Sequence, residues 1–131
     1  MQKSQKGFTL IELVVVIVLL GILGVTALGK YQDLATDAQD AVNEGVASEM
    51  AAASAINYAA SVVGTADVAI PTATACNTLT GLFQADALPS GVTITGTVTC
   101  AGGAGDTGSC SVDGSGTPAG ATATATIICT Q

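Results

Sequence analysis

The sequence predicts an α+β protein, in which a long N-terminal α-helix over residues 8–63 carries a small antiparallel β-sheet head over residues 64–131. Three observations support this fold class. A nearly uncharged apolar run covers residues 8–28, and a helical pattern continues from it without a break. Two segments of alternating threonine and apolar residues follow near the C-terminus, as expected of β-strands.

The apolar run of residues 8–28 has 21 residues and one charge, Glu12. A helix needs about 20 apolar residues to cross the hydrocarbon core of a membrane. Lys3 and Lys6, on the short flank, favour an N-terminus inside the cell and the bulk of the chain outside. A secretory signal peptide is the alternative, but this run is longer than a usual signal and no A-x-A cleavage site ends it. Because a lone carboxylate at membrane depth is costly, Glu12 is predicted to be functional.

The stretch Lys6-Gly7-Phe8-Thr9-Leu10-Ile11-Glu12-Leu13 resembles the class III signal of type IV prepilins. The resemblance covers only the N-terminal part of the chain, to about residue 30. It implies that residues 1–7 are a leader, that prepilin peptidase cuts between Gly7 and Phe8, and that the new amine of Phe8 is methylated. It also implies the type IV pilin fold. A more particular likeness, to mannose-sensitive haemagglutinin-type pilins, rests on Ile11-Glu-Leu-Val-Val-Val-Ile-Val and the later Leu-Gly-Ile-Leu.

The same resemblance implies a partner for Glu12. Cleavage after Gly7 creates a positive amine at Phe8, and a neighbouring subunit's Glu12 would pair with it in the filament core. Two isolated charges among packed apolar helices would each be heavily penalised, so the pair would form only when the subunits are in the correct register.

Beyond residue 28, apolar residues recur on one helical face, which we predict to be the face that carries the head: Leu34, Ala38, Val42, Ala53, Ile56, Ala60 and Val63. Acidic residues follow a line on the opposite face, either hydrated or in contact with a neighbouring subunit's Lys30: Asp33, Asp37, Asp40 and Glu44. Glu49 falls on the apolar side, where it is either exposed beyond the head or paired at an interface. Gly64 is a natural end for the helix.

No proline occurs before Pro71, although many type IV pilins carry one near the middle of this helix. Gly21, Gly24 and Gly29 occupy that zone instead, and each weakens a helix by about 1 kcal/mol relative to alanine. Local unwinding between Gly21 and Gly29 is one interpretation. Close packing of helices against these small residues is a second, and the two are compatible.

In the head, residues 92–100 and 121–129 are predicted strands, residues 110–113 a shorter one, and Leu79, Leu82 and Phe83 a short helical turn. The four cysteines, Cys76, Cys100, Cys110 and Cys129, predict two disulfides in an oxidising compartment. Three pairings are possible. Strand adjacency favours Cys100–Cys110 with Cys76–Cys129, and Cys76–Cys100 with Cys110–Cys129 is nearly as well supported.

The composition excludes several functions. A net charge of −7 argues against nucleic acid as a partner. Without histidine, a carboxylate dyad or a phosphate loop, the chain is not expected to be an enzyme. The spacing of Asp106 and Asp113 lacks the carboxylate alternation of a calcium loop, so neither a metal nor a cofactor is expected.

The combined prediction is a structural subunit of a type IV pilus that serves adhesion or motility. It would sit in the inner membrane of a Gram-negative bacterium before assembly and in an extracellular pilus afterwards. Its partners would be identical or related pilin subunits, membrane lipid, prepilin peptidase and the pilus assembly machinery. The alternative is a pseudopilin of a type II secretion system, which the four cysteines disfavour.

Overall fold

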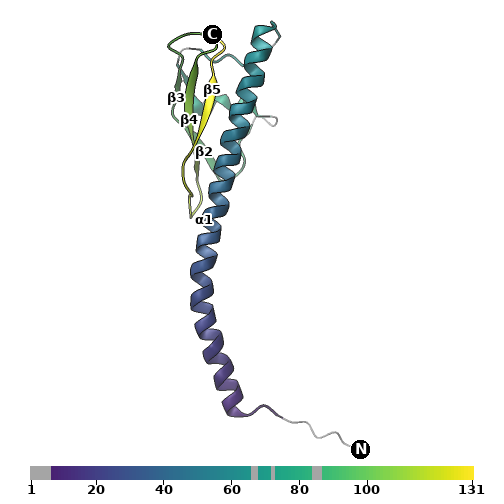
Figure 1. Ribbon diagram of the computed structural model, residues 1–131, viewed down its shortest axis with the longest axis vertical. Coiled ribbons are helices and arrows are strands. Elements are labelled where there is room, and N and C mark those ends of the chain that lie inside the picture. Colours follow the sequence, from purple (N-terminus) through teal and green to yellow (C-terminus); the bar gives the residue numbers. More distant parts are fainter. Residues whose placement is uncertain (1–6, 66–67, 72, 84–86) are drawn as a thin grey trace, which may run out of the picture. The chain divides into compact units, whose positions relative to one another are not determined.

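The computed structural model describes residues 7–65, 68–71, 73–83 and 87–131. A long helix precedes all the strands, as Figure 1 shows. The elements in chain order are α1 (Leu10–Val62), β1 (Ala73–Ala75), the 3-10 helix η1 (Cys76–Leu82), β2 (Val92–Thr95), β3 (Thr97–Thr99), β4 (Thr107–Gly114) and β5 (Ala123–Ile128). This order confirms the predicted α+β class. Most of the predicted leader, with Lys3 and Lys6, lies outside the described residues.

The chain divides into two compact units, one ending at Leu34 and one running from Ala35 to Gln131. The first unit contains the N-terminal part of α1, and its apolar side chains are exposed. The second unit contains the rest of α1 and the head.

Helix α1 ends at the predicted glycine. Gly64 has a φ of 73°, a left-handed conformation that favours glycine. Its N–H donates to Ser61 O at 3.1 Å, and the N–H of Thr65 donates to Ala60 O at 3.0 Å. These two bonds form a Schellman motif, which satisfies carbonyl groups that the end of the helix would otherwise leave free.

The head has two small antiparallel sheets. One has three strands in the order β2-β4-β5, and the other pairs β1 with β3. Ile94 lies opposite Val112, and Cys110 lies opposite Ala125. The strands alternate as predicted, because Val92 and Ile94 are buried while their threonine neighbours are exposed.

The predicted strand over residues 92–100 is divided in two. Gly96, with a φ of 103°, separates β2 from β3. After this break β3 pairs with β1, a strand that the sequence did not predict. The short strand predicted at residues 110–113 is instead the longest of the head, β4, and it lies at the centre of the three-stranded sheet.

The prediction of which helix face carries the head was wrong. Val42, Ile56 and Val63 are 45%, 72% and 72% exposed. The buried residues of α1 lie on a different face and include three polar side chains: Asn43, Val46, Ala47, Met50, Ser54 and Asn57. The physical reason is that this face must satisfy free backbone groups of the head as well as bury apolar surface.

Two of these polar residues bond to strand β5 and the chain just before it, which lie beside α1 (Figure 1). The Asn43 side-chain amide donates to Ala121 O at 2.8 Å. The Ser54 hydroxyl accepts from the N–H of Ile128 at 3.3 Å, and it lies 2.8 Å from Ala51 O of its own helix and 3.4 Å from Thr126 O, the two acceptors open to its proton. Helix α1 therefore supplies hydrogen-bond partners to an edge of the sheet that no further strand covers.

The third polar residue, Asn57, holds the chain that leaves the helix. Its side-chain amide donates to Val68 O at 2.8 Å, and its side-chain oxygen accepts from Val68 N–H at 2.7 Å. Among the described residues, every buried side-chain nitrogen or oxygen has a hydrogen-bond partner.

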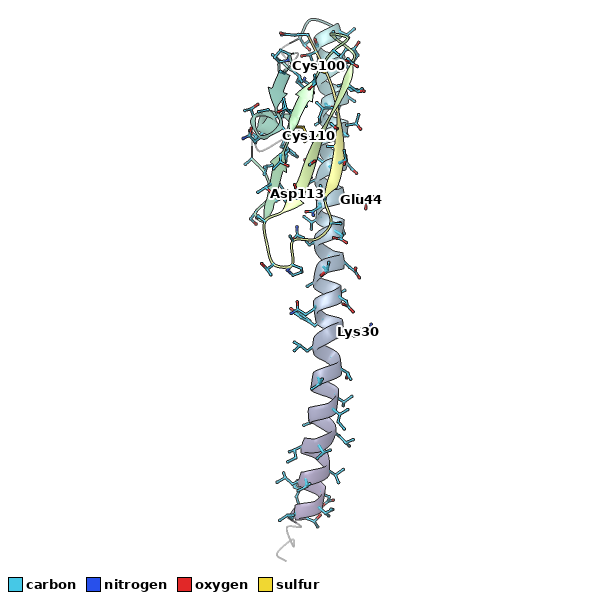
Figure 2. The ribbon with its side chains drawn as sticks, turned by 90° about the vertical axis from the view of Figure 1, so that its left-hand side faces the viewer. Lys30, Glu44, Cys100, Cys110 and Asp113 are labelled. Atoms are coloured by element: carbon cyan, nitrogen blue, oxygen red, sulfur yellow. A yellow bond between two sulfur atoms is a disulfide. The ribbon has the colours of Figure 1, made fainter. Side chains whose placement is uncertain are left out.

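The disulfides pair Cys76 with Cys110 and Cys100 with Cys129, with Cα atoms 5.7 Å and 6.0 Å apart. The favoured pairing of Cys100–Cys110 with Cys76–Cys129 was therefore wrong, and so was its close alternative. Figure 2 shows Cys100 and Cys110 at different levels of the head.

Strand β1 explains this pairing. Strand β3 pairs with β1, and Cys100, which follows β3, lies against the segment of Ile70, whose carbonyl oxygen is 3.9 Å from Cys100 Sγ. Strand β1 leads directly into Cys76, whose N–H donates to Gly96 O and whose Sγ lies 3.8 Å from the carbonyl of Ser109, next to Cys110.

Candidate assembly site at the N-terminal end of α1

The start of α1 brings together Thr9 and Glu12. Thr9 lies just before the first helical residue, Leu10, so it occupies the N-cap position and Glu12 the third helical position. The Glu12 carboxylate accepts from the Thr9 backbone N–H at 2.9 Å and from its hydroxyl at 2.7 Å. The Glu12 N–H donates to the Thr9 hydroxyl oxygen at 3.3 Å. This reciprocal arrangement is a capping box.

The capping box was not predicted, although the sequence carried its signal. The spacing Thr9-x-x-Glu12 before an apolar run is typical of a helix N-terminus. Glu12 was instead interpreted through its position in the membrane and through its pairing with the Phe8 amine of a neighbouring subunit. The carboxylate therefore has a local hydrogen-bonding role within the single chain.

Phe8 lies next to this cap, and its side chain is 91% exposed. Phe8 and Glu12 border the same open, mainly apolar hollow of about 570 Å³, together with Ile11, Val15 and other apolar residues. The predicted cleavage site is the peptide bond between Gly7 and Phe8. A new amine at Phe8 would adjoin Thr9, whose backbone N–H already donates to Glu12.

The surroundings of Glu12 are apolar and exposed. The large apolar side chains from Leu10 to Leu28 all have substantial exposed surface. Within the described part of the chain, α1 is the helix that is long and apolar enough to cross a membrane by length and composition, with a mean hydropathy of 2.8 in its most apolar stretch.

Lys30 gives Glu12 no ionic partner. Its ammonium lies 3.6 Å from the carboxylate of Asp33, one helical turn away, and both side chains are exposed. Figure 2 shows the Lys30 side chain pointing away from α1. The pair of Lys30 with Asp33 is the one ion pair among the described residues. The Glu12 carboxylate is therefore held by hydrogen bonds from Thr9, and no described cation pairs with it.

Helix α1 is continuous through Gly21, Gly24 and Gly29. A Cβ atom added to any of them would meet no neighbouring group of the chain within 4 Å. Packing within a single chain therefore does not explain the glycines. Thr26, in the same zone, donates its hydroxyl to Leu23 O at 2.9 Å, which satisfies this polar group inside the apolar stretch.

The two head carboxylates considered as metal ligands have protein partners. Asp106 accepts from the N–H of Gly102 and that of Thr107, each at 2.8 Å. These two bonds, first that of Gly102, lower the pKa of Asp106 below its usual value. Asp113 accepts from the Thr95 hydroxyl at 3.3 Å and from that of Thr122. The described residues contain no group of three or more His, Cys, Asp or Glu that could hold a metal ion.

Residues 2–28 match the family model described as the prokaryotic N-terminal methylation motif. A fimbrial protein of Pseudomonas aeruginosa is 46% identical over 66 residues, which are 49% of this chain and 43% of that protein. A type IV major pilin protein, PilE1, of Neisseria gonorrhoeae is 56% identical over 39 residues, which are 30% of this chain and 24% of that protein. No solved structure matches the chain significantly.

The aligned part spans less than half the length of these relatives. The long N-terminal helix with small antiparallel sheets packed on its C-terminal part is consistent with the pilin fold. The N-terminal motif, the fimbrial and pilin relatives and the fold together support a type IV pilin.

Proposed function

We propose that the chain is a structural subunit of a type IV pilus, inserted in the inner membrane through residues 8–28, processed by prepilin peptidase and polymerised into an extracellular filament. The observation that carries this proposal is Glu12. It is a carboxylate one turn into an exposed apolar helix, beside a site where cleavage would create a positive charge.

Cleavage links processing to assembly. Hydrolysis of the Gly7–Phe8 peptide bond leaves a carboxylate on Gly7 and an amine on Phe8, which methylation leaves positively charged. In the filament, this amine pairs with the Glu12 carboxylate of a neighbouring subunit. Burying either charge alone among apolar helices would be costly, so the pair favours one register over others.

The remaining assignments follow the same proposal. Residues 1–7 are the leader and residues 64–131 the head on the outer side of the membrane. The partners are other pilin subunits, membrane lipid, the peptidase and the assembly machinery. A Gram-negative host is proposed because relatives occur in Pseudomonas aeruginosa and Neisseria. Adhesion or motility is the proposed role of the filament.

Intact-mass analysis of filaments sheared from cells tests this function. We expect an abundant chain that begins at methylated Phe8 and is four hydrogens lighter than the reduced chain, because it contains two disulfides. A membrane fraction from cells without the peptidase is the control and should retain residues 1–7. A processed chain that never enters surface filaments would contradict the pilus and favour the pseudopilin.

A further inference from the structure

Glu49 is an acidic residue among apolar neighbours. It lies on α1 within the unit that contains the head and is exposed. It borders a hollow of about 370 Å³ between α1 and η1 with Ala52, Ala53, Ile56 and Leu82. Among the described residues Glu49 has no ion-pair partner, since the one ion pair found there joins Lys30 to Asp33.

This hollow adjoins a second one. The second also measures about 370 Å³ and shares Ala53, Ile56 and Leu82 with the first. Ile56 is exposed, and Leu82 is half-buried against the head core. Together the two hollows form a mainly apolar groove that contains the Glu49 carboxylate and the Asn57 side chain, and we call it the Glu49 groove.

The groove continues an uncovered apolar face of the helix. Val42 and Val63 lie on the same face as Ile56, and both are exposed. The head covers a different face of α1, the one that contains Met50 and Ser54. A second molecule is therefore needed to remove this apolar surface from water.

The chain itself contains a segment that complements the groove. After the proposed cleavage, Lys30 is the only basic side chain in residues 8–131. It is flanked on α1 by exposed apolar side chains, those of Leu28, Tyr31 and Leu34. A cation bordered by apolar groups matches an anion bordered by apolar groups, which is the complementarity that sets register at protein interfaces.

We propose that the Glu49 groove of one subunit receives the segment of residues 28–34 from a second copy of the chain, with Lys30 of that copy paired to Glu49. This proposal rests on the proposed filament function and adds a second contact to the pairing of Phe8 with Glu12. Apolar contact excludes water from the groove, and the ion pair neutralises Glu49 there.

Lys30 is available for this contact. The two side chains of its pair with Asp33 are 87% and 69% exposed, and exposed ion pairs contribute little free energy. The other acidic hollow of the head is a poorer site, because threonine side chains line it and Asp40 already accepts from the N–H of Ala121. Glu49 lies among apolar side chains, where the loss of solvent on binding strengthens an ion pair most.

Carbodiimide cross-linking of sheared filaments tests the contact directly. The reagent joins a carboxylate to an amine by an amide bond and takes up the water that is lost. Because Lys30 is the only lysine of the mature chain, each linked peptide that contains it identifies its partner. We expect a Lys30–Glu49 link in filaments and none in monomers dissolved in detergent.

Other outcomes overturn the proposal. A filament in which Lys30 links only to Asp40 or Glu44 places the contact in the other hollow. A filament with no Lys30–Glu49 link contradicts the groove while leaving the filament function intact. A chain absent from filaments defeats the filament function and the groove with it.

Charge reversal gives an independent test. Glu49→Lys or Lys30→Glu places like charges together, so we expect sheared filament to fall by about tenfold or more. The double variant restores the opposite charges and should recover most of the yield. Asp37→Lys is the matched control, because it changes the net charge equally on the acidic face and should leave the yield nearly unchanged. Equal losses in Glu49→Lys and Asp37→Lys, or a double variant no better than the singles, would contradict the pairing.

Discussion

At the N-terminus of α1, the Glu12 carboxylate has one observed role and one proposed role. Glu12 caps the helix through Thr9 in the single chain, and we propose that it binds the Phe8 amine of a neighbour in the filament. The cap holds the carboxylate at the helix start, next to the position where the proposed cleavage would create the new amine. A glutamate already oriented by Thr9 loses less conformational freedom on assembly than a free one.

Substitutions of Glu12 separate these two roles. Glu12→Gln keeps a capping box, because glutamine can also accept from the Thr9 N–H, but it removes the charge. Glu12→Ala removes both. We expect both variants to remain in the membrane and to assemble poorly, because the unpaired Phe8 amine would cost about 3–5 kcal/mol in the filament core.

Thr9→Val is the matched control for the cap. It removes the hydroxyl and weakens the cap by about 1 kcal/mol, but it keeps the charge, so filaments should still form. Filament yield from sheared cells and subunit content of the membrane are the measurements. Normal piliation of Glu12→Gln would show that the charge is not needed.

Asp106 makes the stability of the head depend on pH. Its pKa in the folded chain is lowered by bonds from the N–H groups of Gly102 and Thr107. A group whose pKa is depressed on folding stabilises the protein above its unfolded pKa, about 3.9 for aspartate. This contribution is lost as the pH falls through the lower, folded pKa.

We therefore expect thermal unfolding of the full chain in detergent to shift to lower temperature below about pH 4. Asp106→Asn should flatten that part of the pH profile. Asp37→Asn, which neutralises an exposed carboxylate on α1, is the control and should leave the profile unchanged. Identical profiles for the wild type and Asp106→Asn would show that Asp106 does not contribute.

At the scale of elements, α1 and β5 meet through polar contacts as well as apolar ones. Ser54 is fully buried and bonds to the backbone of Thr126 and Ile128. An edge strand that rests against a helix leaves peptide groups without a neighbouring strand, and a short polar side chain can satisfy them. Small polar residues on the buried face of α1 thus provide hydrogen-bond partners to backbone groups of the edge strand β5.

Ser54→Ala should destabilise the head by about 1–3 kcal/mol, because it removes a buried hydrogen-bond partner from β5. Denaturant unfolding followed by circular dichroism measures the difference. Ser48→Ala, at an exposed position of the same helix, is the matched control and should change the free energy of unfolding by less than about 0.5 kcal/mol. Equal effects of the two substitutions would contradict the role given to Ser54.

The three glycines in the apolar part of α1 belong to the same scale. Gly24→Ala should stabilise the helix of the single chain by about 1 kcal/mol, since nothing in the chain obstructs a methyl group there. If the glycines allow unwinding in the filament, backbone amides between Gly21 and Gly29 will exchange hydrogen rapidly in wild-type filaments and slowly in Gly24→Ala filaments. Slow exchange in both would favour close helix packing instead.

For the whole molecule, the sequence predicted the fold class and the end of α1 at Gly64, because helical periodicity and a terminal glycine are strong local signals. It also predicted the alternation of Val92 and Ile94 with threonine. These features depend on neighbours in sequence. The motif around Phe8 was specific enough to indicate the family before the fold was known.

Features that depend on contacts between distant parts of the chain could not be predicted from the sequence in this way. Strand β1 is a three-residue segment, Ala-Thr-Ala, whose alternation is too short to mark a strand, yet its pairing with β3 bears on the disulfides. The buried face of α1 was missed because Asn43 and Ser54 look like solvent-facing residues. Only their contacts with β5 and its preceding loop explain their burial.

The disulfide pairing itself is open to test at this scale. Peptide mapping without reduction should recover Cys76 linked to Cys110, and Cys100 linked to Cys129. Replacing both members of either pair with serine should lower the free energy of unfolding by about 2–4 kcal/mol. A peptide joining Cys100 to Cys110 would contradict the structure.

The two disulfides are interleaved along the chain, and this order has a consequence for a filament exposed to proteases. Cys76–Cys110 and Cys100–Cys129 form overlapping loops, so each peptide bond between Cys76 and Cys129 lies inside at least one of them. A single cut anywhere in that stretch leaves both fragments covalently joined. With sequential pairing, a cut between residues 101 and 109 would sever the C-terminal part of the head. In the proposed filament, a subunit cut between Cys76 and Cys129 should therefore keep all of its head until its disulfides are reduced.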